Sequence, residues 1–191
     1  VDDGTHIWVS HPFHGVYKVA KENNSNEKVK IYTEVNGLPS TLNNHVFKVK
    51  NEILIATEKG VYGYNEAKDI FVANQFYQNL LGEQSLRYLK EDKEGNIWFI
   101  HEKQLGVVDM SSKTPRIIYI PELNNKLLSG FELVYPVDES NIFVAGESGL
   151  FNLNYKKYKK NNYELQVHIR EVRITGDNTD SLLFGGYFSG Q

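Results

Sequence analysis

The chain has 191 residues, a formal net charge of −3 and 40% hydrophobic residues, so it can bury a core and resembles soluble globular proteins in composition. Its mildly acidic balance disfavours nucleic acid and anionic lipid as partners, because both attract basic proteins. The absence of cysteine excludes disulfides and thiolate metal sites. No apolar stretch approaches the ~20 residues that cross a bilayer, and any export or anchoring signal is expected outside this sequence.

Four isoleucines mark a repeat along the chain. Each follows a turn and opens a short apolar strand, and they lie 46, 44 and 45 residues apart, at Ile7, Ile53, Ile97 and Ile142. After a polar gap, a glycine introduces an apolar pair in every unit, at Gly15, Gly60, Gly106 and Gly149. Because glycine suits the positive φ of a tight reversal, each unit is predicted to contain a hairpin.

Further alternating runs flank the hairpins. Upstream runs occupy 46–49, 86–89 and 133–137, and downstream runs occupy 29–32, 70–72 and 117–120. The pattern predicts four short strands per unit, and such a unit recurring every ~45 residues is typical of a β-propeller blade. A helical solenoid would show a 3.6-residue period instead. The best candidate for a short helix is 74–84.

The predicted fold is therefore all-β, a partial β-propeller of about four four-stranded blades followed by the first strand of a β-sandwich domain. The propeller blades are placed at 1–43, 44–84, 85–130 and 131–163. The first blade begins at its turn, so its innermost strand is expected to be missing. After residue 163 the phase breaks, and the alternating run 166–174 with a turn at 176–178 predicts that a different β domain opens within 164–191.

Two motifs resemble a known family. The segments 92–99 (DKEGNIWF) and 36–40 (NGLPS) are similar to two-component regulator propeller repeats, and the likeness covers about 1–160. The tail resembles the start of the triple-tyrosine domain that follows such propellers. In the second and fourth units the tryptophan of the motif is replaced by Leu54 and Phe143.

The resemblance implies an extracytoplasmic sensor segment of a Bacteroides-type hybrid two-component system. Such a segment would be periplasmic, within an inner-membrane protein, and would respond to an oligosaccharide and regulate polysaccharide use. The intact protein would then be a histidine kinase, whereas this segment would be no enzyme and would need no cofactor. Its partners would be the oligosaccharide, the remaining blades and the sandwich domain, with a homodimer also compatible and no nucleic acid bound.

Ligand-binding residues are expected on the turns inside the hairpins, which emerge on the same propeller face as the entry loops 39–44 and 127–130. The first turn stands out because His11, Phe13 and His14 offer two imidazoles and a ring to a sugar, on a loop stiffened by Pro12. The remaining candidates occupy comparable turns, at Glu58, Lys59, His101 and Glu147. No catalytic residue is expected, and the spacing of the histidines matches no metal-ligand signature.

Two alternatives stay open on the sequence. The first is a propeller enzyme, a polysaccharide lyase or glycosidase, with an acid/base pair drawn from Glu58, Glu102 and Glu147. The second is a non-catalytic scaffold that binds other proteins. The basic run 155–160, in which tyrosines alternate with lysines, is interpreted as a solvated connector rather than a nucleic-acid site.

Overall fold

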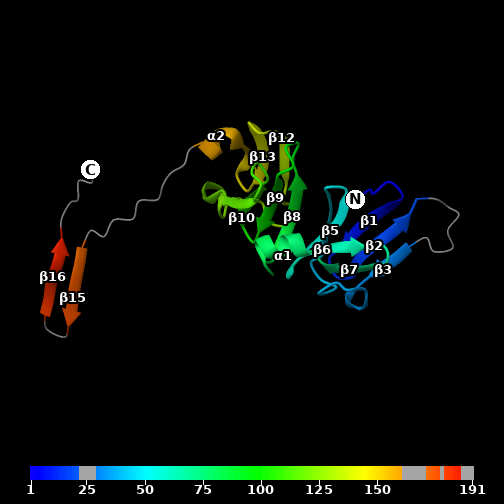
Figure 1. The fold of residues 1–191 in the computed structure, drawn as a ribbon, viewed down its shortest axis with the longest axis horizontal. Coiled ribbons are helices and arrows are strands. Elements are labelled where there is room, and N and C mark those ends of the chain that lie inside the picture. The colour runs from blue at the N-terminus through cyan, green and yellow to red at the C-terminus, as the bar shows by residue number, and fades with distance from the viewer. Residues whose placement is uncertain (22–28, 161–170, 177–178, 186–191) are drawn as a thin grey trace. The chain divides into compact units, whose positions relative to one another are not determined.

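The computed structural model describes residues 1–21, 29–160, 171–176 and 179–185. The chain divides into two compact units, Val1–Tyr158 and Lys159–Gln191. Figure 1 shows that the first unit is built from antiparallel strands that follow one another along the chain. The second unit contains a single described hairpin.

The first unit contains four antiparallel sheets in chain order. The first two sheets are formed by β1 (His6–His11), β2 (Gly15–Ala20) and β3 (Val29–Tyr32), and by β4 (His45–Val49), β5 (Glu52–Thr57), β6 (Gly60–Asn65) and β7 (Ile70–Ala73). The third and fourth are formed by β8 (Leu86–Glu91), β9 (Ile97–His101), β10 (Gln104–Asp109) and β11 (Arg116–Tyr119), and by β12 (Val134–Asp138), β13 (Asn141–Gly146) and β14 (Gly149–Leu153). Short 3₁₀ turns lie between sheets, at Glu34–Asn36 and Pro121–Leu123.

The all-β prediction is confirmed, and the four sheets are consistent with propeller blades. The second and third sheets have four strands each, and the first and fourth have three described strands each; the first sheet lacks its innermost strand, as the sequence predicts. The strand that the first sheet lacks is the first strand of a unit, which is β4 in the second sheet and β8 in the third. In the fourth sheet, the chain leaves β14 and forms helix α2 (Tyr155–Lys160) in place of a described fourth strand.

Helix α2 corrects the interpretation of 155–160 as a solvated connector. The side chain of Tyr155 is fully buried, its ring lies 5.0 Å from that of Trp98, and its hydroxyl donates to Oδ2 of Asp109 at 2.6 Å. Burial and the neighbouring carboxylate of Asp109 both raise the pKa of Tyr155. This tyrosine therefore anchors the helix to the third sheet, while Lys156 and Lys157 face solvent.

The predicted helix within 74–84 is confirmed as α1 (Gln75–Leu81). Asn74 caps it, because its side-chain oxygen accepts hydrogen bonds from the backbone amides of Phe76 and Tyr77. Tyr77 and Leu81 are buried in the core between the second and third sheets. The helix thus fills the connection between these two sheets.

Each sheet of the first unit packs one face against the opposite face of the next sheet. One side of each interface consists of the residue after a repeat glycine and the residue after an anchor isoleucine. The other side consists of the next anchor isoleucine along the chain and the residue two positions after it. The buried pairs of faces are Trp8 and Val16 with Ile53 and Ile55, Leu54 and Val61 with Ile97 and Phe99, and Trp98 and Val107 with Ile142 and Val144. Burying a large apolar side chain of this kind contributes about 1.5–3 kcal/mol, so these interfaces hold the unit together.

The two tryptophans occupy core positions because each has an acidic partner in the turn before its strand. Nε1 of Trp98 donates to Asp92 at 3.0 Å, and Nε1 of Trp8 donates to Asp3 at 2.5 Å. A buried indole N–H needs such an acceptor. The second sheet has no acid in this turn, where Lys50 and Asn51 both adopt positive φ, and it places Leu54 at the tryptophan position.

The second unit is described through an antiparallel hairpin of β15 (Glu171–Gly176) and β16 (Thr179–Gly185). The register of this hairpin shifts between Val172 and Arg173. The predicted strand 166–174 lies in part outside the described residues, which resume at 171. Assignment of this unit to a sandwich domain stays a prediction.

Candidate functional site

The first predicted turn packs beside the loop that leads into β4. The amide of Gly15 donates to the carbonyl of Thr41 at 2.8 Å, and the amide of Asn43 donates to that of Pro12 at 3.3 Å. The rings of His11 and His14 lie 4.5 Å apart, and the amide of Phe13 donates to Nδ1 of His11. The three predicted residues of this turn therefore stand together, with the ring of Phe13 exposed.

The other predicted residues divide between neighbouring turns. Glu58 accepts from Nδ2 of Asn43 at 2.6 Å, so it joins the group around the loop before β4. Glu147 lies 3.8 Å from Nζ of Lys103, between the turns of the third and fourth sheets. Lys59 lies in the β5–β6 turn, and His101 is the last residue of β9.

The carboxylates considered for acid/base chemistry have different partners. Glu58 binds Asn43, and Glu147 pairs with Lys103. Glu102 sits in the β9–β10 turn with a φ of 53°. In the residues that the structure describes, no group of three or more histidine, aspartate or glutamate side chains is arranged to hold a metal ion.

A cleft of about 290 Å³ opens where the first strands of three sheets begin, and we call it the entry cleft. It draws on the end of β1, the starts of β4 and β8, and the segment just before β12. Its lining combines aromatic rings with both signs of charge, from Ser10, His45, Val46, Phe47, Arg87, Tyr88, Gly130, Phe131 and Glu132. This combination suits a polar ligand that also has an apolar face.

Contacts between consecutive sheets hold the walls of the entry cleft. The hydroxyl of Ser10 accepts from the amide of Val46 at 2.7 Å, which joins the first sheet to the second. The rings of Phe47 and Tyr88 meet edge to face at 5.3 Å, and the hydroxyl of Tyr88 donates to the carbonyl of Val134 at 3.1 Å. The cleft is therefore framed by all four sheets.

The ring of Phe131 is 76% exposed at the rim of the cleft. Beside it, the carboxylate of Glu132 accepts from the amide of Gly130 at 3.0 Å, which orients it. Arg87 is exposed on β8 and has a coulombic influence on His45. The cleft thus presents a guanidinium, a carboxylate and an open ring to solvent.

His45 is a partly buried titratable group of the entry cleft. Burial lowers the pKa of its imidazole, Arg87 adds to that effect, and Glu132 opposes it. The folded chain therefore takes up this proton at lower pH than the unfolded chain does. Stability from this group is present above the ordinary pKa of 6.5 and is lost as the pH falls through the folded value.

We expect the free energy of unfolding to fall between about pH 7.5 and about pH 5, a window above the usual range of carboxylates. His45→Gln should reduce that loss, because glutamine takes up no proton. Urea unfolding at the two pH values measures it, with His14→Gln on the exposed turn as the matched control. A decline as steep in His45→Gln as in the wild type would contradict the assignment.

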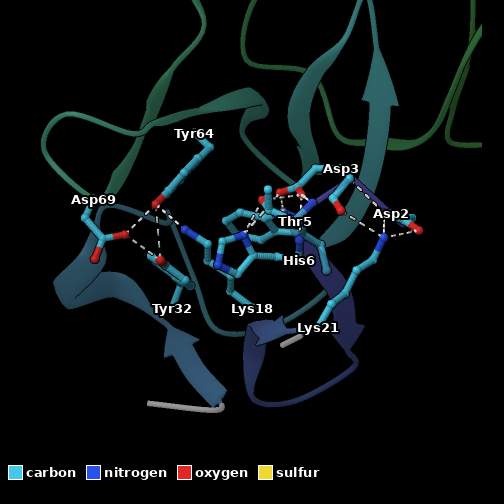
Figure 2. Close-up of polar contacts among 11 residues, drawn as sticks. Asp2, Asp3, Thr5, His6, Lys18, Lys21, Tyr32, Tyr64 and Asp69 are labelled. Carbon is cyan, nitrogen blue, oxygen red and sulfur yellow. Dashed lines mark hydrogen bonds and ion pairs between the residues drawn. The ribbon is translucent and has the colours of Figure 1, made fainter. Parts of the chain in front are cut away.

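A second cleft, of about 350 Å³, lies between the first and second sheets on residues that include Asp3, His6, Lys18 and Tyr64. Its polar groups bind one another, as Figure 2 shows for Lys18, which donates to the hydroxyl of Tyr64 at 2.9 Å. Asp3 accepts from Trp8, His6 and Thr5, and these bonds outweigh burial and hold the pKa of Asp3 well below its usual range.

Next to this second cleft, Asp69 accepts from the hydroxyls of Tyr32 and Tyr64, both at 2.5 Å, and pairs with Lys30. Lys30 first, then the two tyrosines, hold the pKa of Asp69 well below its usual range. Tyr32 comes from β3 and Asp69 from the turn before β7. The network therefore ties the first sheet to the second, and its groups are engaged in that structural role.

None of the seven predicted residues lines the entry cleft. The loops 39–44 and 127–130 were predicted to lie at a ligand site, but His45 and Glu132, which lie just after them, and Arg87 near the start of β8 were not. The sequence signal for these side chains is a charged residue within the first residues of each first strand or just before it. The assignment of the seven residues to a ligand site stays a prediction.

No protein-family model matches the chain, and no curated protein matches it significantly. Among the described residues, no helix is long and apolar enough to span a membrane. Solved structures do match, and their chains are several times longer than this one, which spans about a fifth of their length.

Two structures of the extracellular domain of BT4673 from B. thetaiotaomicron, described as a proposed one-component and a proposed hybrid two-component system, superpose with a TM-score of 0.58. The alignments cover 82% of this chain and 22% of that chain, at 19% and 21% identity. The extracellular domain of BT3049, a proposed hybrid two-component system of the same organism, gives a TM-score of 0.56 at 16% identity over 81% of this chain and 19% of that one. The chain therefore has a fold similar to that of a segment of these extracellular domains.

Proposed function

We propose that the chain is a ligand-sensing segment of the extracytoplasmic region of a hybrid two-component sensor histidine kinase. The segment itself is non-catalytic, and the intact protein lies in the inner membrane with this region in the periplasm. It responds to an oligosaccharide and thereby regulates polysaccharide use. The observation that carries the proposal is the likeness of four-fifths of the chain to extracellular domains of proposed two-component systems.

The entry cleft is the ligand site in this proposal. An exposed ring such as Phe131 stacks on the apolar face of a sugar, while Arg87 donates to hydroxyl or carboxylate oxygens and Glu132 accepts from hydroxyls. The carboxylate is already oriented by the amide of Gly130. A saccharide would thus find an aromatic ring, an oriented acceptor and a donor in the lining of one cleft.

The position of the cleft supports a sensing role. Its walls come from all four sheets, and their contacts at Ser10 and Tyr88 bridge neighbouring sheets. A ligand that touches several sheets at once favours one relative arrangement of them over another. Differential affinity of this kind is the requirement for a ligand to shift a conformational equilibrium.

Calorimetry of the chain against a panel of neutral and acidic oligosaccharides tests the proposal. We expect binding of at least one member, and we expect Arg87→Ala and Phe131→Ala each to weaken it by at least about tenfold. Lys90→Ala is the matched control, because this exposed base lies on the same strand as Arg87 but outside the lining of the cleft.

The panel also separates the two candidate surfaces. Replacement of His11, Phe13 and His14 by alanine leaves binding unchanged if the entry cleft alone holds the ligand. If binding survives Arg87→Ala but is lost when His11, Phe13 and His14 are replaced, the ligand binds at the β1–β2 turn and not in the entry cleft. The absence of heat with every member would favour a scaffold over a sensor.

A further inference from the structure

Arg87 stands at an irregular point of β8, where this strand lines the entry cleft. On β9, the partners of its two neighbours, Leu86 and Tyr88, are adjacent residues, so the register shifts across Arg87. An extra residue of this kind in one strand changes the direction in which its side chain points. The side chain of Arg87 is exposed and contributes to the lining of the cleft.

Within the described ranges, the guanidinium of Arg87 makes no hydrogen bond and no ion pair. Glu132, the carboxylate of the same cleft, accepts from the amide of Gly130 instead. The two hydroxyls of the lining are also engaged, because those of Ser10 and Tyr88 bond to backbone groups of neighbouring sheets. Arg87 is therefore a charged donor whose hydrogen-bonding capacity is unused.

At about pH 7.5 the charges in the lining of the cleft are those of Arg87 and Glu132. Burial lowers the pKa of His45 below its ordinary value of 6.5, despite the opposing charge of Glu132, so its imidazole is neutral at this pH. A ligand that fills the cleft takes water away from the guanidinium. Removing a charge from water is costly unless an opposite charge and hydrogen bonds replace the water. The ligand is therefore expected to bring an anionic group to Arg87.

We propose that the entry cleft selects a uronate-containing oligosaccharide, with a sugar carboxylate bound by the guanidinium of Arg87. The proposal rests on the proposed function, which makes this cleft an oligosaccharide site. A guanidinium matches a carboxylate through two parallel N–H···O bonds, a geometry that a neutral hydroxyl cannot offer. Sugar hydroxyls donate to Glu132, and the apolar face of the sugar packs on the exposed ring of Phe131.

Matched pairs of oligosaccharides test the proposal. Each pair contains an acidic member and its carboxyl-reduced counterpart, in which a hydroxymethyl group replaces every carboxylate. Oligogalacturonate, oligomannuronate and unsulfated chondroitin oligosaccharides supply the acidic members, and calorimetry at about pH 7.5 measures both members of each pair. At least one acidic member should bind, and its dissociation constant should be at least about tenfold lower than that of its reduced counterpart.

Replacement of Arg87 by glutamine gives the second measurement. Glutamine keeps polar atoms at this position but removes the charge and the planar fork. Arg87→Gln should weaken binding of the acidic member at least about tenfold and should change binding of the reduced member less than about twofold. Arg87→Lys should lose part of the affinity, because it keeps the charge without the fork. Lys90→Gln is the matched control, because Lys90 is an exposed base of the same strand outside the lining of the cleft.

The outcomes separate this inference from the proposed function. Equal affinity for both members of every pair, binding of reduced members alone, or an equal effect of Arg87→Gln on both members would overturn the inference and leave a saccharide sensor standing. A loss in Lys90→Gln as large as that in Arg87→Gln would overturn it as well, because general charge attraction would then explain the preference. If no member of any pair bound the wild-type chain, the inference and the proposed function would both be contradicted.

Discussion

Replacing Trp98 with alanine should lower the free energy of unfolding by about 3–5 kcal/mol, the usual cost of emptying a buried aromatic site. The indole is fully buried, donates to Asp92, and lies 5.0 Å from the ring of Tyr155. Its loss leaves a cavity where the third sheet meets the fourth sheet and helix α2. Urea unfolding followed by circular dichroism measures the change.

Trp98→Phe is the matched control for this prediction. It keeps most of the apolar volume and removes the indole N–H, while Oδ2 of Asp92 still accepts from Nδ2 of Asn96 at 2.9 Å. We therefore expect a cost of about 1–2 kcal/mol, close to that of one hydrogen bond and a small void. Equal costs for the two variants would mean that the hydrogen bond, and not packing, stabilises this interface.

The repeat made the sheets predictable from the sequence because strand position follows from local pattern. An isoleucine after a turn and a glycine before an apolar pair each recur at a fixed phase. Three of the anchor isoleucines, Ile53, Ile97 and Ile142, lie in the cores between sheets. The short helix α1 was also predictable, since Asn74 supplies its cap. Local turn and cap chemistry determined these elements.

The end of the fourth sheet was less predictable because one buried side chain decides it. Four lysines dominate the composition of 155–160, so the segment reads as solvated. Tyr155 nevertheless finds a buried partner in Asp109, which lies 46 positions earlier in the chain. A pairing between residues so far apart leaves no periodic trace in the sequence.

The entry cleft escaped prediction for a related reason. Its side chains come from β1, β4, β8 and the segment before β12, and no two of its charged residues share a sheet. Which of them face the cleft depends on strand register, because a shift by one residue moves every side chain to the other face. The turns inside the hairpins are continuous in sequence and were therefore easier to identify.

Gly15→Ala should destabilise the chain by about 2–5 kcal/mol through two costs that act together. Gly15 has a φ of +74°, a conformation that costs alanine about 1–2 kcal/mol. A Cβ at this position would also lie 2.0 Å from the carbonyl oxygen of Tyr32, a backbone atom of β3 that cannot move without breaking the sheet. Overpacking of this kind adds about 1–3 kcal/mol.

Gly95→Ala separates these two costs. Gly95 has a φ of +82°, but a Cβ there would meet nothing within 4 Å. It should therefore pay only the backbone cost of about 1–2 kcal/mol. Urea unfolding of both variants gives the comparison, and the difference between them measures the close approach of the β1–β2 turn to β3. Equal losses would show that the turn at Gly15 shifts to admit a side chain, and that the repeat requires glycine there for its φ alone.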